Sequence, residues 1–429
     1  MKKYMPLIFV ELYLMATLVI FYFGPIHYNI RNGKLFLMLI LLCHGFFIFG
    51  YVAACNLRTN RYNQPTKKEY SELTYWILFI LGFVGVWNTY KNIMLSDTII
   101  PYNFFDDLIR GFTEPGLAYA DRMESIGDAQ TSGSRFFNII FIFYAFAKLL
   151  FVFYSLFFWN KLGSVNKLFF FLYSLIFISS GISAGLNSVI FLFFIFTTIS
   201  IIVILIERRY RYLRWVLLLC VVLFLLPVTW FGSIMAERGG GFDYFASTSP
   251  LGDISVSSTF DLNDSSSFFD FLYYSFVWLC YYVAQGYYGF SLILNLDFEW
   301  TYGFGNSEFL QRQFLMITGL DISPFTFQSR IDHLWGKSAQ WHSFYAQAAN
   351  DVGLIGLPFL LCIVGFIFGK VWYTVIYHKN FFGLALIPIF SIMFIFFPAN
   401  NQVFGFIDTF SYFIFVTIIW ALSNKRLGV

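Results

Sequence analysis

The sequence predicts an all-α polytopic membrane protein, and composition is the first reason. Apolar side chains make up 59% of the 429 residues, aromatic side chains 23% and charged side chains only 12%. A soluble domain carries about twice that share of charge. The 27 cations and 24 anions nearly cancel. This balance excludes two classes of protein, a basic nucleic-acid-binding protein and one dominated by a long acidic tail.

Long apolar runs are the second reason. A helix needs about 20 residues to cross roughly 30 Å of hydrocarbon. We identify ten candidate spans, at approximately 5–23, 35–55, 73–90, 136–158, 168–182, 187–206, 215–234, 352–373, 381–398 and 403–422. The first is long, carries Glu11 and lacks a small-x-small cleavage site. We therefore expect a retained span rather than a cleaved signal peptide.

The distribution of Lys and Arg predicts the orientation. With the N terminus in the cytoplasm, the cytoplasmic connections carry 16 cations, whereas the short external connections carry only Arg31 and Lys34. Cytoplasmic loops of membrane proteins are enriched in Lys and Arg, so both termini are expected in the cytoplasm. The chain then divides into 1–234, with seven spans and an external loop at 91–135, a large external loop at 235–350, and 351–429 with three spans.

One further stretch, 268–296, is apolar enough to be a span. A single extra crossing would invert every positively charged connection after it. Gly286 and Gly289 interrupt the stretch, and Gln285 lies within it. We expect an interfacial or re-entrant hairpin on the external face, with two short crossings or a buried apolar core of the loop as alternatives.

Charged residues inside spans are costly and tend to be paired or functional. Glu11 lies in the first span and Lys148 in the fourth. We expect these two residues to pair and brace the bundle, with a proton path as the alternative. Asp408, near the outer end of the tenth span, is expected to line a cleft beside Asn400 and Asn401. The five cysteines are scattered without paired spacing, which favours packing roles over disulfides or a zinc site.

The external loops hold the candidate site, because long loops in compact proteins are usually functional. Outside, the sequence has seven Arg to three Lys, whereas inside it has seven to nine. The planar guanidinium suits bidentate recognition of phosphate or carboxylate. The candidate diphosphate ligands are Arg135, Arg238, Arg312 and Arg330. Pairing with nearby Asp or Glu is the alternative for each.

His342 is the candidate general base. Neutral imidazole can take a proton from a hydroxyl at neutral pH, because its unperturbed pKa is about 6.5. The residue opens a spaced motif: His342-Ser343, nine residues, Gly353, two residues, Gly356. The motif resembles a signature shared by the bacterial O-antigen polymerases and the related O-antigen ligases. Strings of tyrosine and glycine at 281–289 and 301–305 also resemble the polymerases.

The resemblance in topology covers the whole chain, whereas the resemblance in sequence motifs covers roughly residues 281–356. It departs from the family at the turn 181–188, which lacks the Arg that relatives often place there. It implies a GT-C-like fold and a metal-independent glycosyltransferase without a cofactor. Such enzymes join undecaprenyl-diphosphate-linked repeat units at the periplasmic face of the bacterial inner membrane during lipopolysaccharide biosynthesis. Partners would be membrane lipids, a flippase and a chain-length regulator, and no nucleic acid.

The resemblance also implies roles for individual residues. His342 would be the base or would orient the acceptor hydroxyl, with Asp332 or Asp351 fixing its tautomer. Aromatic rings can stack on the apolar faces of sugars. The candidate sugar-binding residues are Trp335, Trp341, Tyr287, Tyr288, Asp332 and Asp351. An O-antigen ligase, which transfers the glycan to lipid A core, shares the histidine motif. A lipid-linked oligosaccharide transporter or flippase and an acyltransferase are more distant alternatives.

Overall fold

The computed structural model describes residues 2–57, 69–93, 103–128, 135–208, 248–251, 253–256 and 268–426, with single positions at 218, 231 and 235. Apart from those single positions, the predicted span 215–234 lies outside the described residues, as does the segment Glu237–Gly241 with Arg238. The nine other predicted spans are all helical. They correspond to α1 (Met5–Phe23), α2 (Gly33–Asn56), α3 (Glu72–Ile93), α6 (Arg135–Phe157), α7 (Ser164–Ser183), α8 (Asn187–Glu207), α14 (Phe344–His378), α15 (Phe381–Phe396) and α16 (Ile407–Arg426).

These helices have the length and polarity of membrane-spanning segments. Six in the described part of the chain are long and apolar enough to cross a bilayer, and three shorter apolar helices accompany them. A bilayer core offers no hydrogen-bonding partner to the backbone, so helical segments that satisfy their own N–H and C=O groups are required. The prediction of an all-α membrane protein is confirmed at this level. The likeness to a GT-C fold stays a prediction.

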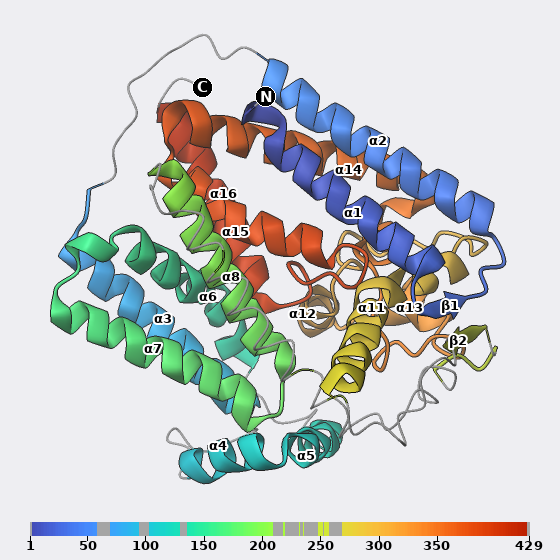
Figure 1. The fold of residues 1–429 in the computed structure, drawn as a ribbon, viewed down its shortest axis with the longest axis horizontal. Helices are drawn as coiled ribbons and strands as arrows, with labels where there is room; N and C mark the ends of the chain where they lie inside the picture. The colour runs from blue at the N-terminus through green and yellow to red at the C-terminus, as the bar shows by residue number, and fades with distance from the viewer. Residues whose placement is uncertain are drawn as a thin grey trace.

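The ends of α1, α2 and α8 that were predicted to be cytoplasmic lie on the same side of the bundle as both termini (Figure 1). Lys3, in the 3-10 turn just before α1, donates to Asn56 at the end of α2, with 3.0 Å between Nζ and Oδ1. Trp372 near the end of α14 donates to the carbonyl of Lys2. Lys379, just after α14, lies 3.5 Å from the Glu207 carboxylate at the end of α8. These contacts bring the ends of α1, α2, α8 and α14 together, whereas the orientation of the chain in a membrane stays a prediction.

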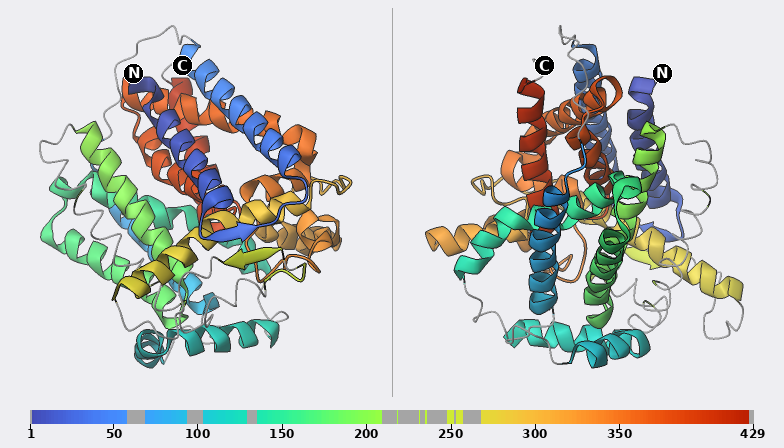
Figure 2. Two further views of the ribbon diagram at one scale, coloured as in Figure 1. Left: turned by 45° about the vertical axis from the view of Figure 1, so that its right-hand side comes forward. Right: turned by 90° about the vertical axis from the view of Figure 1, so that its left-hand side faces the viewer.

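At the opposite end, α4 (Phe104–Thr113) and α5 (Pro115–Asp128) run across the ends of α3 and α7 (Figures 1 and 2). Gly111 permits this approach, because a Cβ there would lie 2.0 Å from the carbonyl oxygen of Ile182. Gly185, in the turn between α7 and α8, has φ of +59° and abuts Pro115 in the same way. The loop 91–135, which is predicted to be external, thus includes a helical layer packed onto the bundle.

The loop 235–350, which is predicted to be external, also contacts the first part of the chain. Its strand β2 (Ile254–Val256) pairs antiparallel with β1 (Ile26–Tyr28), and Ile26 lies opposite Val256. The segments are separated by more than 200 residues, and neither has a length or alternation that would predict a strand. The remaining short elements are α12 (Glu308–Thr318), α13 (Phe327–Arg330) and the 3-10 turns at Lys2–Tyr4, Trp159–Lys161 and Ser323–Phe325.

The stretch 268–296 was predicted to be a hairpin, and this is wrong. It contains one continuous helix, α11 (Phe268–Leu292), which packs against α1 and α14. Gly286 and Gly289 stand three residues apart within it and mark a close contact rather than a turn. From Val277 to Ser291 most side chains are buried, so the alternative of a buried core of the loop describes this segment better.

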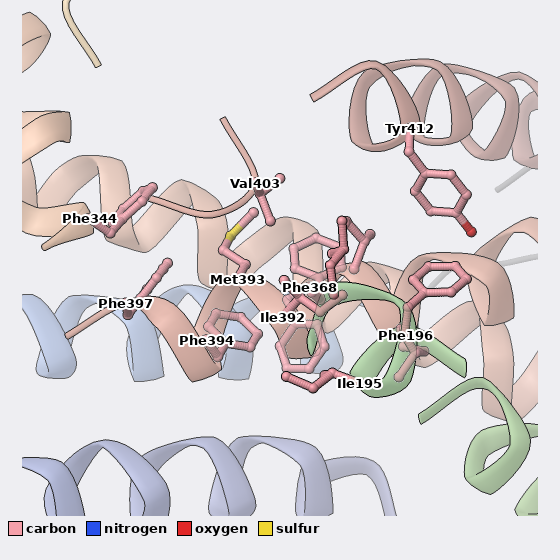
Figure 3. Packing of buried hydrophobic residues seen from close by; sticks show 14 of the residues in the cluster. Ile195, Phe196, Phe344, Phe368, Ile392, Met393, Phe394, Phe397, Val403 and Tyr412 are labelled. Carbon is pink, nitrogen blue, oxygen red and sulfur yellow. The ribbon is translucent and has the colours of Figure 1, made fainter. Parts of the chain in front are cut away.

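A buried apolar cluster joins α8, α14, α15 and α16 (Figure 3). At its edge, the rings of Phe344 and Phe397 stack with centroids 4.3 Å apart. Phe397 opens a ten-residue connection, 397–406, between α15 and α16. The connection is mostly buried, and the backbone N–H of Phe344 donates to the carbonyl of Phe397 at 2.9 Å. The predicted spans left only about four residues for this connection, so its extent is a correction.

Candidate functional site

The His342 segment is held between α11 and the connection 397–406. A Cβ on Gly286 would lie 2.4 Å from the carbonyl oxygen of Pro398 and 2.7 Å from the backbone nitrogen of Ser343. A Cβ on Gly289 would lie 3.3 Å from Nδ1 of His342. Only a residue without a side chain fits at Gly286. The glycines of the string 281–289 thus give the histidine motif its place against α11.

The motif residues after His342 form the start of α14. Ser343 caps the helix, its hydroxyl accepting a hydrogen bond from the N–H of Ala346. Gly353 has φ of +68° and ψ of 172°, and this non-helical residue separates the first turns of α14 from the long apolar part. A residue with a side chain is strained in that region. Ser343 and Gly353 therefore bound a short helix that leads from the loop into the span.

His342 itself is buried, with 3% of its surface exposed. Burial disfavours the imidazolium and lowers the pKa of His342 to about 4, although a backbone contact with Gly336 and the charge of Asp332 oppose the shift. Neither ring nitrogen makes a hydrogen bond of normal geometry within the described residues. The imidazole is therefore neutral at pH 7 and able to accept a proton, but it has no carboxylate hydrogen-bonded to it.

The two predicted partners of His342 have other roles. One carboxylate oxygen of Asp351 accepts from the Thr301 hydroxyl at 2.6 Å and from the Gly305 N–H at 2.8 Å, and the other accepts from the Asn306 N–H at 2.9 Å. Asp351 thereby fixes the turn at 301–306. Asp332 is exposed and accepts from the backbone N–H of Lys337. The prediction that either one holds the tautomer through a hydrogen bond is wrong.

Three predicted sugar-stacking residues are packed in the interior. Trp335 is fully buried, and its indole N–H donates to the carbonyl of Trp341. Tyr287 is also fully buried, with its hydroxyl 3.1 Å from that of Thr17 on α1. Tyr288 packs edge-on against Trp335, and its hydroxyl lies 3.1 Å from that of Ser249. These rings form the core beneath the external loop and present no face to a ligand.

The candidate arginines differ in their surroundings. Arg330 lies 3.2 Å from the Glu299 carboxylate and donates to the carbonyl of Asp297, so the alternative of local pairing holds there. Arg135 begins α6, but its side chain lies outside the described residues. Arg312 on α12 is exposed and makes no ion pair with any residue that the structure describes. Among the candidate arginines whose side chains the structure describes, it is the one that remains available to an anion.

Two adjoining cavities lie beside the connection 397–406. The polar one has a volume of about 590 Å³ and is lined by Arg312, Lys148 and Asp408 with uncharged side chains. The other, of about 280 Å³, has a mainly apolar and aromatic lining that includes Trp341, Tyr282, Phe191 and Phe396. Residues lining both cavities are Leu186, Ser188, Gln402 and Phe406. His342 lines neither, although its neighbour Trp341 does.

The polar cavity contains an ion pair between two predicted spans. Lys148 Nζ on α6 lies 2.5 Å from Oδ2 of Asp408 on α16 and donates to the Thr89 hydroxyl on α3 at 2.7 Å. The predicted Glu11–Lys148 pair is wrong. The Glu11 carboxylate instead lies 2.8 Å from Nδ1 of His44 on α2. Asp408 lines a cavity as expected, but beside Gln402. Asn400 lines the apolar cavity, and Asn401 is buried against Asn306.

Thr89, Gln313 and Gln402 also line the polar cavity and were not predicted from the sequence. Gln402 could have been identified from the sequence, because Asn400, Asn401 and Gln402 form a polar run within an otherwise apolar stretch. Thr89 and Gln313 lie on helices where a single polar residue has no distinguishing pattern. Their place in the cavity lining can be seen only in the folded protein, where they lie beside Lys148 of α6 and Asp408 of α16.

Comparison with protein-family models, with curated proteins and with solved structures finds no match. The histidine motif and the cavities therefore carry the functional argument.

Proposed function

We propose that the protein is a glycosyltransferase that polymerises polyprenyl-diphosphate-linked oligosaccharide repeat units, as the O-antigen polymerases do. The observation that carries this proposal is the pair of adjoining cavities. One presents the unpaired Arg312 together with Lys148, and the other is lined by aromatic and aliphatic side chains. A lipid-linked glycosyl diphosphate has the same division between an anionic centre and an apolar chain.

In this reaction, a sugar hydroxyl of a lipid-linked repeat unit attacks the anomeric carbon of a second lipid-linked glycan. The bond from that carbon to the diphosphate oxygen breaks, and its electron pair leaves with the polyprenyl diphosphate. Growth is thus at the reducing end. Arg312 would stabilise the negative charge that develops on the leaving diphosphate, because a cation positioned beside a developing negative charge lowers its energy.

His342 takes the role of proton acceptor in this proposal. Its ring is neutral at pH 7, but the lowered pKa makes it a weaker base while it is buried. Trp341, the preceding residue, lines the apolar cavity. Because the imidazole is buried, the segment between α11 and the connection 397–406 must open for the ring to meet an acceptor hydroxyl. The proposed setting is the outer face of the bacterial inner membrane, with both termini in the cytoplasm.

The test supplies the purified protein with lipid-linked repeat units alone and resolves the products on a gel. The proposal predicts a ladder of polymers. Product that forms only after lipid A core is added identifies a ligase instead. Movement of the lipid between leaflets without a glycosidic product would identify a flippase. His342→Ala should abolish the ladder in protein that still accumulates and folds, and Arg330→Gln serves as the control outside the cavities.

A further inference from the structure

The helix α4 exposes an apolar face. Phe105, Ile109 and Phe112 are 74%, 61% and 59% exposed. They follow one another at spacings of four and three residues, so their side chains lie on one face of the helix. Large apolar side chains that gather on a surface mark a contact with a membrane or with another protein. The remaining faces of α4 and its place in the fold decide between these two.

Two further faces of α4 have different neighbours. Gly111 lies directly against the carbonyl oxygen of Ile182 on α7, so one face is packed on the bundle. The residues of the third face are polar and exposed: Asp106, Arg110 and Thr113. At roughly 100° per residue, the bundle face, the apolar face and the polar face each take about a third of the circumference.

The position of α4 is that of a membrane surface. The helix crosses the ends of α3 and α7, which are both long and apolar enough to span a bilayer (Figures 1 and 2). The span-forming part of α3 ends at Tyr90, and the ring of Phe104 on α4 lies with its centroid 5.3 Å from that of Tyr90. The start of α4 is therefore at the depth where a span reaches the edge of the hydrocarbon.

We propose that α4 is an interfacial helix whose apolar face is embedded in the leaflet at this end of the bundle, the leaflet predicted to be the outer one. The bundle, the lipid and water then each meet one face, as in helices that lie in the plane of the interface. Attraction to anionic headgroups is not the cause, because Asp106 and Asp107 outnumber Arg110 on α4. The apolar side chains hold the helix in the leaflet.

The embedded helix also fixes one wall of the apolar cavity. Arg110 of α4 forms an ion pair with Asp121 of α5, and Tyr119 of α5 lines that cavity. Pro115, which begins α5, abuts Gly185 in the turn between α7 and α8. The helix α4 thus holds α5 beside the cavity at the level of the lipid surface. This inference depends only on contact with a membrane and stands without the proposed glycosyltransferase activity.

The experiment attaches a nitroxide label to single introduced cysteines in the full chain, reconstituted in phosphatidylcholine nanodiscs that hold one copy. Ile109→Cys and Phe112→Cys report on the apolar face, and Asp106→Cys and Thr113→Cys are matched controls on the polar face. Wild-type protein treated with the same reagent measures labelling of the native cysteines, which are not exposed where the structure describes them. All four introduced positions are exposed, so the substitutions leave the packing of α4 intact.

The readout is relaxation of the label by oxygen, which concentrates among acyl chains, relative to relaxation by a water-soluble nickel chelate. This ratio should be several times higher at the two apolar positions than at the two polar ones. Equal access of nickel to all four positions would place the apolar face in water, leave it to a protein partner and overturn the proposal. Shielding that appears only in nanodiscs with two copies would also overturn it, because a second copy would then cover the face.

Lipid composition tests the cause of the embedding. Replacing part of the phosphatidylcholine with anionic phosphatidylglycerol should leave the ratio at the labelled Ile109→Cys position unchanged, because the apolar face requires only acyl chains. Embedding that occurs only with phosphatidylglycerol would show that charge holds the helix at the membrane and would overturn the proposal.

Discussion

Two ion pairs lie between predicted spans, and their surroundings differ. In the pair between α1 and α2, the side chains of His44 and Glu11 are 4% and 14% exposed. In the pair between α6 and α16, the side chains of Lys148 and Asp408 are 2% and 16% exposed. The space beside Glu11 and His44 has no measurable volume, and Tyr345 packs there with its hydroxyl 3.3 Å from Nε2 of His44. The space beside Lys148 and Asp408 is about 590 Å³.

Burial alone therefore does not separate a structural pair from a functional one. The Glu11–His44 pair fills its space and joins two neighbouring helices. The Lys148–Asp408 pair joins helices 260 residues apart in sequence and opens onto a cavity that also contains Arg312. We take the first as a brace and the second as part of a site. The predictions below test this difference in order of expected size.

The largest effect is expected for Asp408→Ala. The change leaves the Lys148 ammonium group buried without its carboxylate, which typically costs about 3–5 kcal/mol of the free energy of unfolding. Denaturant titration of the detergent-solubilised protein measures this change. The double variant Lys148→Met with Asp408→Asn should recover most of the loss. Unchanged stability of Asp408→Ala would mean that the cavity solvates the ammonium group, contrary to the ion pair described.

The next effect concerns His342 and pH. Its pKa is about 4 in the folded protein, against an ordinary value near 6.5, so the unfolded chain binds the proton first as the pH falls. The contribution of His342 to stability is complete above pH 6.5 and is lost between pH 6.5 and about 4, by about 3 kcal/mol. Comparison of wild type with His342→Gln over this range isolates the effect. Parallel stability curves for the two proteins would show that the ring is accessible to water.

A smaller loss is expected for Gly286→Ala. Its Cβ would meet backbone oxygen and nitrogen atoms, and overpacking of this kind costs about 1–3 kcal/mol. Ladder formation should decrease together with stability, because the same contact positions Ser343, which follows His342. Gly45→Ala on α2 is the control, since nothing lies within 4 Å of its Cβ. Thermal unfolding at equal detergent concentration compares the two variants, and equal behaviour would disprove the close approach.

The smallest effect is expected for Glu11→Gln. The amide keeps the volume and can still hydrogen-bond to His44, so the loss should be below about 1 kcal/mol. Thermal unfolding again measures the change. A loss of stability as large as that of Asp408→Ala would show that the Glu11–His44 pair depends on its charge. The distinction between the two ion pairs would then fail.

The spans could be predicted from sequence because lipid imposes a local requirement, namely a continuous apolar helix. The pairing of charges could not, because it depends on how helices rotate and neighbour one another. Lys148 was assigned to Glu11 as the other evident charge within a span, whereas α6 in fact packs beside α16. The motif of His342 was readable from spacing. The burial of Trp335 and Tyr287 could not be read from the sequence, because an aromatic residue in a predicted loop gives the same pattern whether it packs in the core or binds a ligand.

The glycines show the same limit. Gly286 and Gly289 were taken as interruptions of a helix, since glycine lowers helix propensity. Inside a packed bundle the absence of a side chain has a second use, which is close approach by another segment. The neighbouring sequence does not distinguish these uses, because the approaching segments are the His342 motif and, at Gly286, residues more than 100 positions away.

The most direct test compares ladder formation by two double variants from which the buried charges have been removed. One carries Lys148→Met and Asp408→Asn, and the other carries Glu11→Gln and His44→Gln. Both are assayed with lipid-linked repeat units at equal amounts of folded protein. We predict that the first loses the ladder and the second retains it. A ladder of wild-type intensity from the first variant would contradict the assignment of the Lys148–Asp408 cavity as the site of the reaction.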